Sequence, residues 1–155
     1  PEEDITRILQ EYGEERFAKQ IARAVCIRRE EKKIERSGEL AEIVNASIPA
    51  RFRRGDSLAK TFQALRIAVN DELDALRDGL RSATRCLREG GRVAVISFHS
   101  LEDRIVKHYF RELAAEGSFR IITKKPTIPS DDEVRTNPRA RSAKLRIIEK
   151  QRGVL

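Results

Sequence analysis

The 155-residue sequence has no methionine or tryptophan, and only two cysteines and two histidines. Cys26 and Cys86 share no spacing typical of metal ligands, and His99 and His108 add no recognisable set, so no metal site is expected. Both cysteines lie near apolar positions of helical patterns, which predicts small buried thiols. No run approaches the roughly 20 apolar residues of a membrane-spanning helix, and the first residues lack the basic and apolar parts of a signal peptide. We therefore expect a cytoplasmic protein with no membrane partner.

Glycine is sparse, and its placement excludes one class of site. The eight glycines stand at positions 13, 38, 55, 79, 90, 91, 117 and 153. A phosphate- or dinucleotide-binding turn needs clustered glycines directly after a strand. The chain therefore contains no glycine-rich loop for a nucleotide-type cofactor.

Charge, by contrast, is abundant. Charged residues make up 37% of the chain and apolar residues 39%, and the formal net charge is +7 at pH 7. This balance favours helices with solvated faces and a polyanionic partner. One cluster of basic residues follows Pro49, and a second flanks a proline-rich connection; their members are Arg51, Arg53 and Arg54, and Lys124, Lys125, Arg135, Arg139, Arg141, Lys144 and Arg146. Such clusters fit contacts with nucleic-acid phosphates.

Residues 94–104 are the most informative stretch of the chain. A short apolar run predicts a buried strand over 92–98, and Ser100 is expected to cap a helix over 101–116. Polar groups therefore gather at the carboxyl end of the strand, where open α/β sheets bind ligands. We expect Ser97 and His99 to lie at such a site. His99 would either orient a substrate or fix the turn by a hydrogen bond to the backbone.

The rest of the pattern predicts four helices and two strands. Helices are expected over 3–11, over 14–31 and from Ser37, the expected N-cap, to Pro49. A single long helix is expected over 58–88, where apolar residues recur every three or four positions; its stripe consists of Phe62, Leu65, Val69, Leu73, Leu76, Leu80, Ala83 and Leu87. Short strands are expected over 119–123 and 145–148, with a long proline-containing connection between them.

Four ordered blocks of the sequence resemble the bacterial MraW/RsmH family. The first is the segment Ile96-Ser-Phe-His-Ser-Leu-Glu-Asp-Arg-Ile-Val-Lys107. The others are Tyr12-Gly-Glu-Glu-Arg-Phe-Ala-Lys19 with Ile21-Ala-Arg-Ala24, Thr61-Phe-Gln-Ala-Leu-Arg-Ile67 with Val69-Asn-Asp-Glu-Leu73, and Asn137-Pro-Arg-Ala-Arg-Ser-Ala-Lys-Leu-Arg146. Ordered blocks that touch nearly the whole chain are far more specific than one short motif.

The resemblance implies an S-adenosylmethionine-dependent methyltransferase that acts on the exocyclic N4 of a cytosine in 16S ribosomal RNA. Members of the family carry a glycine-rich Asp-Gly-Thr-x-Gly-x-Gly-Gly-type cofactor loop in their first half. This chain, which also lacks an initiator methionine, looks like the C-terminal half. We therefore expect S-adenosylmethionine to be bound mainly by the missing N-terminal half, and this chain alone to be inactive.

The fold implied by the resemblance is α/β: a helical unit followed by the C-terminal part of a Rossmann-like methyltransferase sheet. Residues 1–57 would be a helical inserted domain that faces RNA. Residues 58–155 would supply the long helix and the last strands and helices of the methyltransferase domain. In the isolated chain the strand at 92–98 would expose an edge, which predicts a homodimer or aggregation.

The expected RNA partner is the 16S ribosomal RNA of the small subunit. Its proposed contacts are Arg16, Arg23, Arg53, Arg54, Lys60, Arg139 and Arg141. Arg16 and Arg23 would share a helix face, and Arg139 and Arg141 would point to one side of an extended segment. The alternative is ordinary ion pairing with nearby acidic residues (Glu14 and Glu15, or Asp131, Asp132 and Glu133). Residues 56–60 depart from the family's His-Pro-Ala-Thr-Arg-like segment, and only the positive charge of Lys60 is kept.

A second hypothesis comes from a different class of function. The chain could be a non-catalytic RNA-binding or ribosome-assembly protein derived from the same fold. The glycine-rich half that is missing here separates the two hypotheses. A protein that includes it can hold the methyl donor and act as an enzyme, whereas a protein without it cannot.

Overall fold

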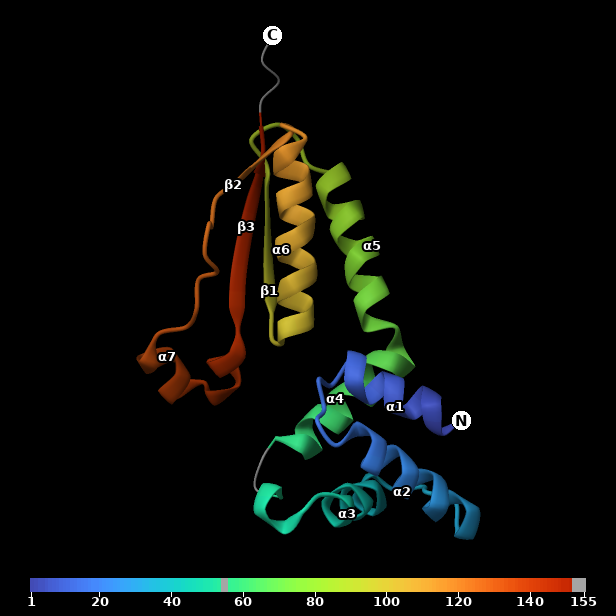
Figure 1. The fold of residues 1–155 in the computed structure, drawn as a ribbon. Coiled ribbons are helices and arrows are strands. Elements are labelled where there is room, and N and C mark those ends of the chain that lie inside the picture. Colours follow the sequence, from blue (N-terminus) through green and yellow to red (C-terminus); the bar gives the residue numbers. More distant parts are fainter. Residues whose placement is uncertain (54–55, 152–155) are drawn as a thin grey trace. The chain divides into compact units, whose positions relative to one another are not determined.

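The computed structural model describes residues 1–53 and 56–151. They form a mixed α/β chain that divides into two compact units, Pro1–Glu72 and Leu73–Leu155 (Figure 1). The first unit is helical and the second contains a small sheet. Within the described residues, no helix is long and apolar enough to cross a membrane.

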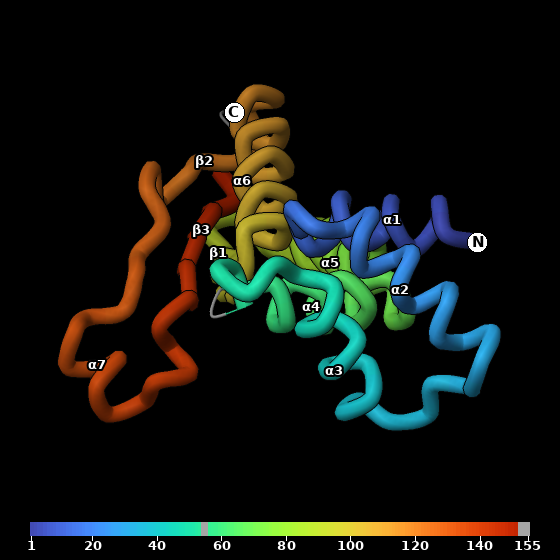
Figure 2. The backbone as a smooth tube through the Cα atoms, turned by 60° about the horizontal axis from the view of Figure 1, so that its bottom comes forward, coloured from blue at the N-terminus to red at the C-terminus, as the bar shows by residue number. Residues whose placement is uncertain are grey.

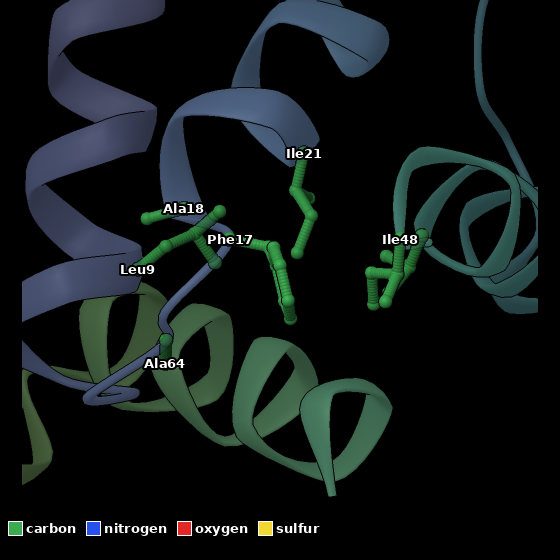
Figure 3. Packing of buried hydrophobic residues seen from close by; sticks show 7 residues of the cluster. Leu9, Phe17, Ala18, Ile21, Ile48 and Ala64 are labelled. Carbon is green, nitrogen blue, oxygen red and sulfur yellow. The ribbon is translucent and has the colours of Figure 1, made fainter. Parts of the chain in front are cut away.

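The first unit contains α1 (Glu2–Glu11), α2 (Ala18–Glu31), α3 (Ser37–Ser47), the 3-10 turn η1 (Ala50–Phe52) and α4 (Ser57–Asn70). Its helices enclose a buried apolar cluster, of which Figure 3 labels Leu9, Phe17, Ala18, Ile21, Ile48 and Ala64. Gly13 allows the turn between α1 and α2 to lie against α4. A Cβ there would stand 2.7 Å from the Leu9 carbonyl oxygen and 2.9 Å from that of Lys60.

Two predicted helix starts in this unit are wrong. The helix expected from residue 14 begins at Ala18, because Glu14 takes a left-handed φ of 48° and the Glu15 carboxylate accepts the Phe17 N–H at 2.7 Å. Ser37 is the first residue of α3 and not its N-cap. The Glu39 carboxylate instead accepts the N–H groups of Glu35 and Arg36, which together with Lys32 lower the pKa of Glu39 to about 2.

The single long helix predicted over 58–88 is also wrong. It is two helices, α4 and α5 (Glu72–Arg85), separated by Asp71, whose left-handed backbone (φ 48°) ends the first helix. A left-handed residue is a common helix terminator, and Asp tolerates that conformation better than most residues. Arg66 fixes the break, because its guanidinium donates to both carboxylate oxygens of Glu72 at 2.8 and 3.1 Å.

The break changes which face of α4 is buried. Thr61, Ala64 and Ile67 are buried, whereas Val69 of the predicted stripe is 80% exposed. In α5 the stripe is correct at Leu80, which is buried, and at Leu76, which packs against the same core, but wrong at Ala83, which is exposed while Thr84 is buried. By its contacts α4 belongs to the first unit. The boundary between the two compact units in the sequence therefore lies between Glu72 and Leu73. The assignment of residues 1–57 and 58–155 to two domains of the family stays a prediction.

The second unit is built on a three-stranded sheet. After α5 come β1 (Arg92–Ser97), α6 (Ser100–Ala115), β2 (Phe119–Ile121), α7 (Asp131–Thr136), the 3-10 turn η2 (Pro138–Ser142) and β3 (Lys144–Lys150). The strand order is β1-β3-β2, and both outer strands run antiparallel to β3. Residues from α5, α6 and all three strands share one apolar core, which includes Leu80, Val106, Phe110, Phe119 and Ile148.

The opposite face of β1 is open. Successive residues of β1 alternate between this core and solvent, so that Ala94 and Ile96 are exposed. Among the described residues β1 has one strand neighbour, β3, and its other edge is unpaired. Association of copies through that edge stays a prediction.

Two further expectations are corrected here. Cys26 is partly buried, but Cys86 is exposed and is no core thiol. The connection expected between the last two strands is not wholly irregular, since it contains α7 and η2 and makes a long excursion from the sheet (Figure 2). Ser130 caps α7 by accepting the Glu133 N–H at 3.2 Å.

The two units differ in charge. Residues 1–72 contain 14 basic and 14 acidic residues, while residues 73–155 contain 18 basic and 11 acidic residues. The whole net charge of +7 therefore belongs to the second unit. Any contact of the first unit with a polyanion must depend on local arrangement and not on overall charge.

Candidate functional site at the carboxyl end of β1

β1 ends at Ser97, and α6 begins three residues later. Ser97 is only 3% exposed, and its hydroxyl donates to the Lys144 carbonyl oxygen at 3.5 Å. This bond ties the end of β1 to the start of β3, its neighbour in the sheet. The structure thus gives Ser97 the role of a turn hydroxyl, as expected for a serine outside any nucleophile motif.

His99, and not Ser100, is the N-cap of α6. Its Nδ1 accepts the Glu102 N–H at 3.4 Å. In return the Glu102 carboxylate accepts the N–H groups of Phe98 and His99 at 2.8 and 3.3 Å, which completes a reciprocal cap. The Nε2 atom of His99 lies 3.4 Å from the second Glu102 oxygen. His99 therefore fixes the turn by a hydrogen bond to the backbone, which is one of its two predicted roles. The other role, orientation of a substrate, stays a prediction.

An ion-pair cluster holds the first turn of α6 to β3. The Asp103 carboxylate accepts Nε and Nη2 of Arg146 at 2.6 and 3.1 Å, and Lys144 Nζ lies 3.6 Å from it. The side chains of Asp103 and Arg146 are 13% and 10% exposed. These hydrogen bonds, chiefly those from Arg146, lower the pKa of Asp103 below its ordinary value. Asp103 is thus a fixed anion that orients the helix start.

This arrangement suits positioning better than covalent catalysis. Ser97 is bonded to a carbonyl oxygen, His99 caps a helix, and the nearest carboxylates are occupied by backbone N–H groups or by Arg146. Within the described residues no three His, Cys, Asp or Glu side chains gather as metal ligands do. What the end of β1 offers is a rigid turn with exposed Phe98 and Ile96 beside it.

Of the predicted RNA contacts, Arg139 and Arg141 lie in this unit. Both are exposed in η2, so the extended conformation that would align them is wrong. Residues two apart in a 3-10 helix do not share a face. Ordinary pairing with the preceding acidic residues is not seen for them either, because Asp132 pairs with Arg135. Both guanidinium groups lack an ion-pair partner in the described part of the chain.

Two basic residues of α6, Lys107 and Arg111, lie outside both predicted basic clusters. Lys107 and Arg111 on α6 line a small hollow together with Lys124, which follows β2. The four-residue spacing of Lys107 and Arg111 places them on one helix face and was a usable signal. Arg146, which borders the same hollow, is already neutralised by Asp103.

The first unit holds the other predicted contacts. Arg16 precedes α2, so it shares no continuous helix face with Arg23, which is exposed on α2. Arg53 is exposed and donates through Nε to the Ile48 carbonyl oxygen at 3.1 Å. Lys60 pairs with Asp56 at 3.2 Å, the ordinary alternative. Arg54 lies outside the described residues.

Comparison with known proteins agrees with the resemblance. The model of a family described as the MraW methylase family matches residues 1–151. A protein named ribosomal RNA small subunit methyltransferase H from Heliobacterium modesticaldum is 53% identical over 98% of this chain and 54% of its own length. Proteins of the same name from Paenibacillus sp. and Neorickettsia sennetsu are 48% and 52% identical, over 96% and 94% of this chain and 52% and 49% of their own lengths. The chain spans about half the length of the curated relatives it matches.

Proposed function

Because the chain belongs to the MraW methylase family, we propose that it forms part of a methyltransferase acting on small-subunit ribosomal RNA. The finer proposal is transfer of a methyl group from S-adenosylmethionine to the exocyclic N4 of a cytosine in 16S ribosomal RNA. The observation that carries the first statement is the identity of about half of all residues to relatives named ribosomal RNA small subunit methyltransferase H. The methyl donor and the target atom are implied by the resemblance of the four sequence blocks to the family.

The residues of this chain do not fit the methyl donor. The turn after β1 is closed by the reciprocal cap of His99 and Glu102, and no clustered glycines follow β1, β2 or β3 within the described residues. Nucleotide-type cofactors are held where glycines let the backbone approach them. S-adenosylmethionine would therefore be bound mainly by the part of the relatives' length that this chain does not match.

The sheet supports the proposed place of this chain in the fold. β3 runs antiparallel between β1 and β2, so β1 and β2 are parallel to each other. Such a mixed edge on an otherwise parallel sheet is common in α/β proteins. A Rossmann-like sheet would continue from the unpaired edge of β1, and α5 and α6 would cover one of its faces.

Methyl transfer requires few catalytic groups from the residues of this chain. Attack of an exocyclic amine on a sulfonium methyl group is a direct displacement, in which alignment of the two centres dominates. Ser97 and His99 would orient the target by fixing the turn at the end of β1, through their bonds to Lys144 and Glu102. Arg16, Arg23, Arg53, Arg139 and Arg141, and Arg54 beyond the described part, would contact phosphates. Lys60, already paired with Asp56, is the weakest of the proposed contacts.

Two experiments test the proposal. The complete protein should produce N4-methylcytidine in 16S ribosomal RNA when incubated with S-adenosylmethionine and small subunits, as measured by mass spectrometry of the digested RNA. A methylated product of another nucleoside, or none, would contradict it. This chain alone should bind the cofactor weakly; micromolar binding in calorimetric titration would show that the cofactor site has been misplaced.

The proposed phosphate contacts are tested by RNA binding. Changing Arg53 and Arg54 to Ala should weaken binding equally for related and unrelated RNAs. It should also reduce the slope of log affinity against log salt by roughly one unit or less per lost contact. An unchanged slope would mean that these arginines are merely solvated. Specific RNA binding by the complete protein without methyl transfer would favour the non-catalytic alternative.

A further inference from the structure

We propose that Arg16, Arg51 and Phe52 form a platform on which a base of single-stranded RNA stacks. The proposal rests on the proposed function, in that it requires the protein to bind RNA. It goes further by naming a site in the unit Pro1–Glu72 and the part of the ligand that this site recognises. That part is the flat base, whereas the phosphate contacts proposed above recognise only charge.

The platform consists of two guanidinium groups that lie over the Phe52 ring. The Arg16 Cζ atom lies 5.0 Å from the centroid of the Phe52 ring and 5.5 Å from that of Phe17. The Arg51 Cζ atom lies 4.9 Å from the Phe52 centroid. Both distances to Phe52 fall within the roughly 6 Å range of cation–π attraction. One ring thus gathers two guanidinium groups from segments far apart in the sequence.

The ring beneath these groups is anchored to the core. Phe52 packs against Phe17, with the ring centroids 5.4 Å apart and the planes tilted by 45°. Phe17 is 9% exposed within the apolar cluster of the unit (Figure 3), and Phe52 packs against the same cluster. The Phe52 N–H donates to the Pro49 carbonyl oxygen at 2.8 Å, which closes η1. A ligand would therefore meet a surface that is already ordered, at little entropic cost.

The two positive charges of the platform form no ion pair within the described part of the chain. Other arginines of the unit, such as Arg7, Arg28 and Arg66, each pair with a carboxylate. Arg16 and Arg51 are exposed and have no such pair among the described residues. The unit is neutral overall, so this pair of cations is a local feature. Flat cations that lie over an aromatic ring suit a ligand that has both a π face and negative charge, and a nucleotide has both.

The test separates stacking from charge. Changing both Arg16 and Arg51 to Lys keeps two positive charges but removes the planar groups. Binding is measured by fluorescence anisotropy with two ten-nucleotide probes: oligouridylate, and the same ribose-phosphate chain without bases. We expect the double variant to bind oligouridylate about tenfold more weakly than the parent, the lower part of the range for loss of one stacked base. The slope of log affinity against log salt concentration should be the same for both proteins, because both carry the same charge. On the abasic chain, parent and variant should bind alike.

Arg29→Lys is the matched control, because Arg29 is exposed on α2, has no ring contact among the described residues and is not one of the proposed RNA contacts. It should bind both probes as the parent does. Equal affinity of the double variant and the parent for oligouridylate would overturn the platform alone, and the two guanidinium groups would then only pack against the Phe52 ring. Equal weakening on both probes would also overturn it, since the loss would lie in phosphate contacts. Failure of the parent to bind either probe would overturn the platform and the proposed RNA binding together.

Discussion

The ion pair between Asp103 and Arg146 should be the strongest single polar contribution to the stability of the unit Leu73–Leu155. We predict that Arg146→Met lowers its free energy of unfolding by about 3 kcal/mol. Breaking a buried pair by removing one partner costs about 3–5 kcal/mol, because the other charge stays buried. The value lies at the lower end of that range because Lys144, 3.6 Å from the carboxylate, remains as a partner.

The assay is urea unfolding followed by tyrosine fluorescence. The chain has no tryptophan, and its two tyrosines fall one in each unit. Tyr109 packs in the core of the second unit and its hydroxyl lies 2.8 Å from that of Thr84. In a Tyr12→Phe background the remaining signal reports the second unit alone.

A second variant shows whether the loss comes from the unpaired charge. Combining Arg146→Met with Asp103→Leu removes both charges, and we expect most of the lost stability to return. A loss that persists in the double variant would mean that packing of the arginine stem, and not charge pairing, holds α6 to β3. A loss of less than about 1 kcal/mol in the single variant, the range of exposed pairs, would refute the reasoning outright.

The same pair predicts a dependence on pH. The folded-state pKa of Asp103 lies below the ordinary value, chiefly because of its hydrogen bonds to Arg146. Its contribution is therefore fully present above the unfolded pKa of about 3.9. It is lost as the pH falls from there through the folded pKa. In Asp103→Asn the fall in stability below pH 4 should be shallower than in the parent.

Three further predictions concern the fold and the site. A Cβ at Gly13 would lie within 2.9 Å of two backbone carbonyl oxygens, so Gly13→Ala should destabilise the first unit by roughly 1–3 kcal/mol in thermal unfolding. Its control, Gly38→Ala in open space, should be neutral or stabilising by up to about 1 kcal/mol. Asp71→Gly should raise stability by up to about 1 kcal/mol because it relieves the left-handed backbone, and a loss would point to a role for the side chain. His99→Ala should lower the stability of the second unit by about 1 kcal/mol through loss of the cap but leave the salt dependence of RNA binding unchanged; a changed slope would show that His99 contacts a phosphate.

Hydrophobic periodicity located most of the helices and all three strands of the described chain, but it could not place their ends. The predicted helix over 58–88 illustrates the reason. Its apolar spacing is continuous through residue 71, whereas the break depends on a backbone conformation and on the Arg66–Glu72 pair. The buried face of α4 was missed for a related reason. Ala64 is buried where Gly13 approaches α4, and the apolar spacing of α4 alone does not reveal that approach.

The candidate site was predictable in position but not in contacts. A strand followed by polar residues and an acidic helix start placed Ser97 and His99 correctly at the end of β1. Which residue caps α6 depends on the rotamer of His99, and the partner of Asp103 comes from β3, 43 residues along the chain. The stacking of Arg16 and Arg51 on Phe52 was likewise invisible, because it joins two segments that only the packing of the first unit brings together.

The central position of β3 in the sheet also affects the order in which the parts of the chain fold. Among the described residues β3 is the last strand in sequence order, yet both other strands pair only with it. During synthesis β1 and β2 would leave the ribosome before β3, and the pairing of these three strands would wait until residues 144–150 emerged. Pairing across about fifty residues, as between Arg92 and Glu149, makes this a slow, non-local step. The helices of the first unit contact one another within residues 1–72, so they would form earlier.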